Sequence, residues 1–85
     1  MARVDAFTGL SELLAVARHQ SFRAAAAELR VTPAAVSQAI RALEARVGLL
    51  LFQRTTRRVA LTEAGTQLLA RVRPAATDIT EALDA

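Results

Sequence analysis

The chain has 85 residues and no cysteine, which leaves room for one domain and excludes disulfides and thiolate metal sites. All 11 basic residues are arginine and the net charge is +3. Residues 18–58 carry eight arginines and two acids, whereas residues 62–85 carry two arginines and four acids. This imbalance predicts a polyanionic partner for the middle of the chain, although a solvated surface accounts for it equally well. No long apolar run opens the chain, so we expect neither a signal peptide nor a transmembrane helix.

Residues 6–18 are predicted to form a first helix, because an apolar stripe repeats at helical spacing at Leu10, Leu13, Leu14 and Ala17. His19 follows in a short turn, and it has none of the companion side chains that a metal or catalytic role needs. Ser21 is an expected cap for a second helix that runs through the alanines at 24–27 to Leu29. A turn of about three residues then leads to a third helix, which is the helix-turn-helix pattern.

The third helix is predicted to start sharply, with Thr32 as N-cap and Pro33 at the first helical position, and to end before Gly48. One narrow face is apolar and is expected to be buried, at Val36, Ile40, Leu43 and Val47. The opposite face carries small side chains, an amide and a guanidinium, with Ser37 on its flank: Ala34, Gln38, Arg41 and Ala45. Such a face suits a helix that enters the major groove of DNA, so residues 33–47 are the predicted recognition helix.

Residues 49–52 are predicted to be a strand or an extended segment, residues 54–57 a polar turn, and residues 58–61 a returning strand. Together they would form a small β-wing that carries Arg54, Arg57 and Arg58. The three aromatic residues are expected to anchor the core and not to form a stacking platform: Phe7, Phe22 and Phe52.

Residues 62–85 are predicted to form a long fourth helix capped by Thr62, with a bend at Pro74. A coiled-coil-like seam runs along Leu68, Val72, Ala75, Ile79 and Ala82. It is widened by Leu69, Ala76 and Leu83. The seam is longer than the rest of the chain can cover. A second copy of the helix is therefore the expected partner, and the protein is expected to be a homodimer.

Four blocks of the sequence resemble the DNA-binding domain of LysR-type transcriptional regulators. They are residues 21–26, 31–44, 48–54 and 59–65, in the order and at the spacing of that family. The resemblance implies a mainly α fold: a winged helix-turn-helix, with three helices and a small two-stranded wing, in residues 1–61, and a linker and dimerisation helix in residues 62–85. The effector-binding domain of the family is absent from these 85 residues, so we expect a fragment or an isolated domain.

The motif and the resemblance together assign the site residues. Pro33, Ala34, Ser37 and Gln38 are expected to read bases. The expected phosphate contacts are Ser21, Arg23, Thr32, Arg41 and Arg54, and the resemblance places Arg57 in the minor groove. Helix capping also explains Ser21 and Thr32, and a solvated side chain or a pair with Glu44 also explains Arg41. Glu28 and Glu44 are read as surface ion-pair partners and not as a catalytic pair.

Two residues depart from the family pattern. Gln38 stands where the family often has arginine, and glutamine pairs with adenine whereas arginine pairs with guanine. Adenine is therefore predicted opposite Gln38. Arg30 stands where the family usually has glycine. If its φ is positive, arginine costs about 1 kcal/mol there.

The predicted function is regulation of bacterial transcription by a non-enzymatic homodimer that binds an imperfect inverted repeat in double-stranded DNA. We expect a cytoplasmic, nucleoid-associated protein with no membrane contact, no metal and no cofactor in this chain. A small molecule is expected to bind the missing effector domain, and RNA polymerase is a candidate partner of the intact regulator. The alternative is a helical protein-interaction module whose arginines meet an acidic protein. A cationic membrane-surface helix fits poorly, since the arginines are spread over several elements.

Overall fold

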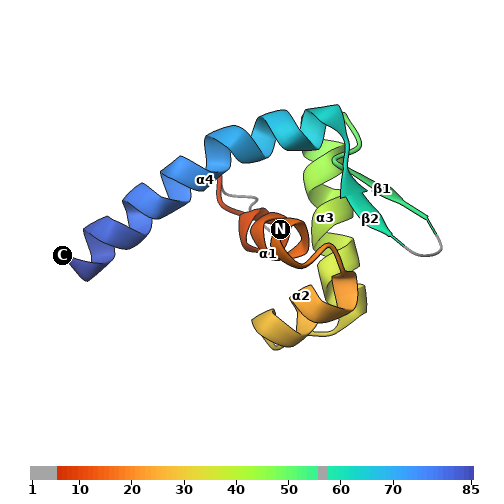
Figure 1. Cartoon of the computed structure of the whole chain (residues 1–85), viewed down its shortest axis with the longest axis horizontal. Coiled ribbons are helices and arrows are strands. Elements are labelled where there is room, and N and C mark those ends of the chain that lie inside the picture. The colour runs from red at the N-terminus through yellow and green to blue at the C-terminus, as the bar shows by residue number, and fades with distance from the viewer. Residues whose placement is uncertain (1–5, 56–57) are drawn as a thin grey trace, which may run out of the picture.

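The computed structural model describes residues 6–55 and 58–85. The elements follow the predicted order and form a winged helix-turn-helix with a long C-terminal helix (Figure 1). They are α1 (Leu10–His19), α2 (Phe22–Leu29), α3 (Pro33–Val47), β1 (Phe52–Arg54), β2 (Val59–Leu61) and α4 (Glu63–Asp84). The mainly α fold expected from the sequence is therefore confirmed.

The first helix starts later than predicted. Gly9 precedes it in the left-handed conformation, with φ 87°, and residues 6–9 form turns. Phe7 is 63% exposed, so the expectation that it anchors the core is wrong. It lies in these turns, ahead of the helical face that carries Leu13 and Val16 into the core. His19 is the last helical residue and not part of the turn, which is made by Gln20 at φ 53°.

The caps of α2 and α3 are those predicted. The Ser21 hydroxyl accepts the Ala24 N–H at 3.1 Å, and the Thr32 hydroxyl accepts the Ala35 N–H at 3.1 Å. Each bond satisfies a first-turn amide that has no partner within the helix. Each of these two helices is followed by a C-cap residue in the left-handed backbone conformation. These residues are Arg30 (φ 59°) and Gly48 (φ 78°). The expected positive φ at Arg30 is thus confirmed.

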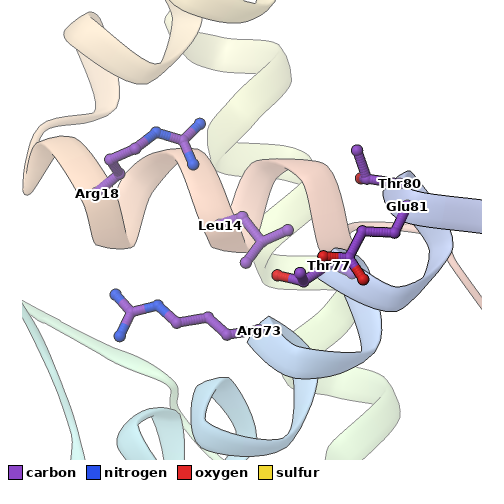
Figure 2. A pocket seen from close by; sticks show the side chains of 7 residues that line it. Leu14, Arg18, Arg73, Thr77, Thr80 and Glu81 are labelled. Carbon is purple, nitrogen blue, oxygen red and sulfur yellow. The ribbon is translucent and has the colours of Figure 1, made fainter. Parts of the chain in front are cut away.

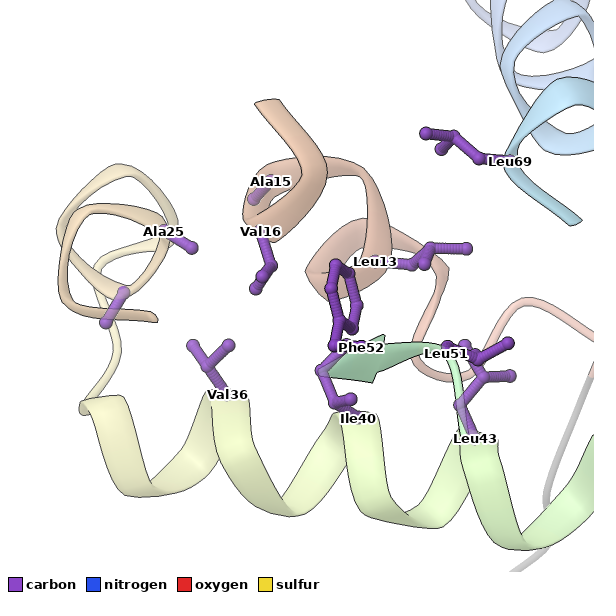
Figure 3. Packing of buried hydrophobic residues seen from close by; sticks show 11 residues of the cluster. Leu13, Ala15, Val16, Ala25, Val36, Ile40, Leu43, Leu51, Phe52 and Leu69 are labelled. Carbon is purple, nitrogen blue, oxygen red and sulfur yellow. The ribbon is translucent and has the colours of Figure 1, made fainter. Parts of the chain in front are cut away.

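The core lies where α3 crosses α1 and α2 (Figure 3). Val36, Ile40 and Leu43 of α3 are buried, as the apolar stripe predicted, and they meet side chains of α1, α2, the wing and α4. The buried partners are Leu13, Ala15, Val16, Ala25, Ala26, Leu51, Phe52 and Leu69. Val47 is 41% exposed, which corrects the prediction that it continues the buried stripe. It is the last residue of α3, past the turns that α1 and α2 cover.

The two strands of the wing pair antiparallel, with Phe52 opposite Leu61 and Arg54 opposite Val59. Pairing begins at Phe52, later than the predicted segment 49–52, and Leu49 and Leu50 are exposed. Arg57, the predicted minor-groove residue, lies outside the described residues.

The last helix combines two environments. Near its start Leu69 is buried, and Leu68 and Val72 pack partly against the core. Farther along, Ile79 is 43% exposed and Leu83 is 80% exposed, and Ala75 and Ala82 are also exposed. The helix continues through Pro74 and changes direction partway along its length (Figure 1). Across residues 6–55 and 58–85, none of the helices combines the length and apolar character needed to cross a membrane.

Candidate nucleic-acid interface

The face of α3 opposite the core is open to solvent. Its exposed residues are Pro33, Ala34, Gln38 and Arg41, with Ser37 half-buried at its edge. Ala34, Gln38 and Arg41 follow one another at spacings of four and three residues, so they share one side of the helix. The four predicted base-reading residues and Arg41, a predicted phosphate contact, therefore lie together on one accessible surface. It is called here the recognition face: Pro33, Ala34, Ser37, Gln38 and Arg41.

The wing reaches this surface through Arg54. Its guanidinium donates to the Ser37 hydroxyl, with Nη1 3.2 Å from Oγ. The guanidinium carbon also lies 4.2 Å from the centre of the Phe22 ring, within the range of a cation–π contact. A residue of the wing, one of α3 and one of α2 thus meet at the edge of the recognition face.

Phe22 is held in turn by the core. Its ring packs edge-on against Phe52, with ring centres 6.2 Å apart and an angle of 67° between the planes. Phe52 is buried, and Phe22 is partly buried. The core-anchoring role expected of Phe22 and Phe52 is confirmed, and Phe22 also contacts the guanidinium of Arg54. The sequence shows no local signal for this contact, because the wing must first fold back over α2.

The remaining predicted phosphate contacts lie on α2, α3 and the turn before α3. Arg23 and Arg41 are exposed, while the hydroxyls of Ser21 and Thr32 serve as helix caps. Arg30 is also exposed in the turn that joins the two helices. The role of these residues toward phosphate stays a prediction.

The two glutamates of the basic region have different roles. Glu28 bonds to the guanidinium of Arg18 and to His19, whose Nε2 lies 2.7 Å from Oε1. The hydrogen bond from Arg18, and then that from His19, lower the pKa of the Glu28 carboxyl below its ordinary value. The ion pair predicted for Glu28 is confirmed. His19, read from the sequence as a turn residue, takes part in it.

Glu44 corrects the ion-pair prediction. Its Oε2 accepts the backbone N–H groups of Leu51 and Phe52, at 2.8 and 3.3 Å. These two N–H groups lie where the chain enters the wing and the strand pairing has only begun. They therefore need an acceptor from outside the sheet. The pairing of Glu44 with Arg41 left open by the sequence is thus replaced by a bond to the backbone of the wing.

A groove lies between α1 and the distal part of α4. Figure 2 shows Arg18 of α1 and Arg73 of α4 extending into it beside Leu14, with Thr77, Thr80 and Glu81 farther along α4. Within the described ranges, no group of three or more His, Asp and Glu side chains is placed to hold a metal ion.

The sequence matches the profile of a family described as bacterial regulatory helix-turn-helix protein, lysR family, over residues 7–66. It is 54% identical over 70 residues to the uncharacterized HTH-type transcriptional regulator YcaN of Escherichia coli K12, covering 82% of this chain and 23% of the relative. It is 51% identical over 74 residues to the HTH-type transcriptional regulator CbbR of Rhodospirillum rubrum, covering 84% of this chain and 25% of the relative. The chain therefore spans about a quarter of the length of these relatives.

Two solved structures have the same fold and were determined with DNA. The CbnR_DBD-DNA complex superposes with a TM-score of 0.84 at 31% identity, covering 94% of this chain and 92% of that one. The BenM_DBD/benA site 1 DNA complex gives a TM-score of 0.84 at 26% identity, covering 89% and 85%.

Proposed function

The chain belongs to the LysR family of bacterial regulatory helix-turn-helix proteins, and from that premise we propose that it is the DNA-binding domain of a transcriptional regulator. The observation that carries the proposal is the recognition face. An exposed helix side of small residues, an amide and a guanidinium, backed by a buried apolar side, fits the major groove. Two solved structures of the same fold are complexes with DNA.

Base reading in this proposal belongs to the first turns of α3. Gln38 offers an amide that pairs with N6 and N7 of adenine, and Ser37 offers a hydroxyl to a base edge. Pro33 and Ala34 are small and exposed, so they suit contact with thymine methyl groups or sugars. Together these residues would supply the choice of sequence.

Affinity in this proposal comes mainly from arginine contacts to phosphate. Arg23, Arg41 and Arg54 are exposed around α3, and the hydroxyls of Ser21 and Thr32 lie at helix N-termini that favour anions. The wing, residues 53–58, would follow the minor groove, where Arg57 is the proposed reader. Because such contacts release counterions, binding should weaken steeply with added salt.

The proposed assembly is a homodimer that meets along α4. Ile79 and Leu83 are exposed apolar side chains on a part of the helix that extends beyond the core, as Figure 1 shows. Two-fold symmetry would place two recognition helices in successive major grooves, about 34 Å apart. The DNA target is therefore an imperfect inverted repeat.

We further propose that the protein acts in the bacterial cytoplasm as a non-enzymatic regulator, since its relatives are named as transcriptional regulators. Those relatives are about three and a half times as long as this chain, which leaves room for an effector-binding domain in the intact regulator. A small-molecule effector and RNA polymerase are the partners proposed for that longer protein.

Selection of duplexes from a randomised pool by the 85-residue chain tests this function. An enriched inverted repeat with half-sites one helical turn apart is the expected result. Ala34→Glu is the matched negative control, because it places an anion on the recognition face at a position where glutamate remains a good helix former. The control should lose the enrichment and keep its helical circular dichroism.

Tight binding at low salt without any enriched sequence would overturn the proposal. It would indicate phosphate contacts without base reading and would favour the alternative of a protein-interaction module with an acidic partner.

A further inference from the structure

We propose that Phe22 is a positioning residue for DNA binding. Its ring holds the guanidinium of Arg54 beside Ser37, so that the wing and the recognition helix approach DNA as one prearranged unit. The inference rests on the proposed function, because it describes how that same interface is prepared before DNA arrives.

The hydrogen-bonding capacity of Arg54 supports this role. A guanidinium has five N–H donors, and a contact with the face of a ring uses none of them. One donor goes to Ser37 Oγ, at 3.2 Å from Nη1. Since Arg54 is exposed, its remaining donors stay available to phosphate or base oxygens while the group is held in place.

The bond also orients Ser37. A serine hydroxyl can accept two hydrogen bonds and donate one. Because Oγ already accepts from Arg54, its own proton is free to point toward an acceptor outside the protein. Acceptors on the major-groove edges include purine N7 and the O6 and O4 atoms. Arg54 thereby favours Ser37 as a donor at the DNA surface.

Phe22 is able to hold Arg54 because it is itself anchored. One side of the residue packs edge-on against the buried ring of Phe52, and the residue is only partly buried. Arginine has a long, flexible side chain, and ordering it at the moment of binding costs rotamer freedom. Ordering it in advance on a fixed ring removes part of that cost from the binding step.

The test measures affinity for the selected duplex with Phe22→Leu, Phe22→Tyr, Arg54→Gln and the double variant Phe22→Leu/Arg54→Gln. Removing the ring should weaken binding about two- to fivefold per recognition helix, whereas the ring-preserving tyrosine should restore it. In the Arg54→Gln background the loss of the ring should have no further effect. A purely structural role would lower affinity to the same extent in both backgrounds.

The matched control is Arg58→Gln, which removes the same charge from the exposed wing. Its effect should simply add to that of Phe22→Leu, because no contact joins Arg58 to the ring among the interactions that the structure records. The salt dependence of DNA binding also distinguishes Arg54→Gln from Phe22→Leu. Arg54→Gln should reduce the slope of log affinity against log salt by about one unit, whereas Phe22→Leu, which keeps the charge, should not.

A second measurement needs neither DNA nor a folded Phe22→Leu variant. In the free protein, the Nε–H proton of Arg54 should resonate upfield of the other arginines because it lies near the face of the ring.

A second double-variant cycle of DNA affinity tests the other end of the contact. It combines Ser37→Ala with Arg54→Gln. Non-additive effects are expected there as well.

The outcomes are distinct. Selective binding by the unmodified chain, with additive effects of Phe22→Leu and Arg54→Gln, would overturn the positioning role alone. An ordinary Arg54 Nε–H shift in the free protein would do the same. Absence of selective binding by the unmodified chain would overturn the proposed function and the positioning role with it.

Discussion

Glu44 accepts the backbone N–H of Leu51 on its carboxylate Oε2 at 2.8 Å, which ties the last turns of the recognition helix to the chain that enters the wing. The same oxygen accepts from the next amide at 3.3 Å. Glu44 is half-buried, so water is only a partial substitute for this acceptor.

Replacement of Glu44 by alanine should therefore destabilise the domain. Two backbone donors lose their acceptor, and the free energy of unfolding should fall by about 1–3 kcal/mol in urea titrations followed by circular dichroism. Glu44→Gln, which keeps a side-chain oxygen, should lose less. Equal unfolding midpoints for Glu44→Ala and the unmodified chain would contradict the role.

Gly65 should not tolerate a side chain. A Cβ built there would lie 2.1 Å from the Leu51 carbonyl oxygen and 2.9 Å from Cδ2 of Leu61, and the first of these is a backbone atom that cannot rotate away. Gly65→Ala should lower the free energy of unfolding by more than about 2 kcal/mol through overpacking.

Gly48→Ala provides the contrast for that experiment. Unlike Gly65, Gly48 has a positive φ, of 78°, and a Cβ there meets open space. Its cost should be the backbone strain alone, about 1 kcal/mol. A loss for Gly65→Ala no larger than for Gly48→Ala would show that α4 shifts to make room.

Arg30→Gly should stabilise the domain. Arg30 has a φ of 59°, where glycine is free of the strain that a Cβ introduces. Strain relief of about 1–2 kcal/mol, less the greater flexibility of glycine in the unfolded chain, leaves an expected gain of about 0.5–1 kcal/mol in thermal unfolding. Arg41→Gly, at a right-handed helical position, should instead lose about 1 kcal/mol. A loss for both variants would refute the strain at Arg30.

The Glu28 cluster should make stability sensitive to acid. The pKa of Glu28 is lowered in the folded protein from the ordinary value of 4.5, so its contribution is present above that value and is lost as the pH falls through the folded pKa. Between about pH 5 and about pH 3, Glu28→Gln should lose less stability than the unmodified chain. Added salt should reduce the difference, because the pair is exposed.

Glu81→Gln is the matched comparison, since Glu81 is an exposed carboxylate on the distal part of α4. If Glu28→Gln and Glu81→Gln lose stability alike between about pH 5 and about pH 3, the bonds to Arg18 and His19 do not stabilise the fold.

Gln38→Arg should change the preferred base. Glutamine pairs with N6 and N7 of adenine, and arginine pairs with O6 and N7 of guanine. Duplexes selected by the variant should carry guanine at the base pair where those selected by the unmodified chain carry adenine. The other positions of the half-site should stay the same. An unchanged preference at that base pair would show that Gln38 does not read it.

The helix-turn-helix was predictable because its signals are local. Thr32 and Pro33 start α3 within one turn, and Gly48 ends it, whatever the rest of the chain does. The alternation of buried and exposed positions along α3 then follows from helical spacing. This places the recognition face without knowledge of the tertiary structure.

The tertiary contacts of the site could not be read in the same way. The cation–π contact joins residues 22 and 54, and the Glu44 bonds reach across a turn whose path depends on the wing. No spacing rule relates such positions. The prediction that Phe7 and Val47 are buried was wrong for the same reason. Both side chains are apolar, but they lie at the ends of elements, beyond the surfaces that would cover them.

Leu51 joins three elements through a single residue. Its N–H is held by Glu44 of α3, its carbonyl accepts the Thr62 N–H at 2.9 Å where α4 begins, and its side chain is buried in the core. Gly65 lets the first turn of α4 press against that same carbonyl. The direction in which α4 leaves the body is therefore coupled to the axis of α3 through the backbone of one residue, Leu51. In the proposed homodimer, these contacts at Leu51 would set the separation of the two recognition helices. That separation would in turn determine the operator spacing that the protein can accept.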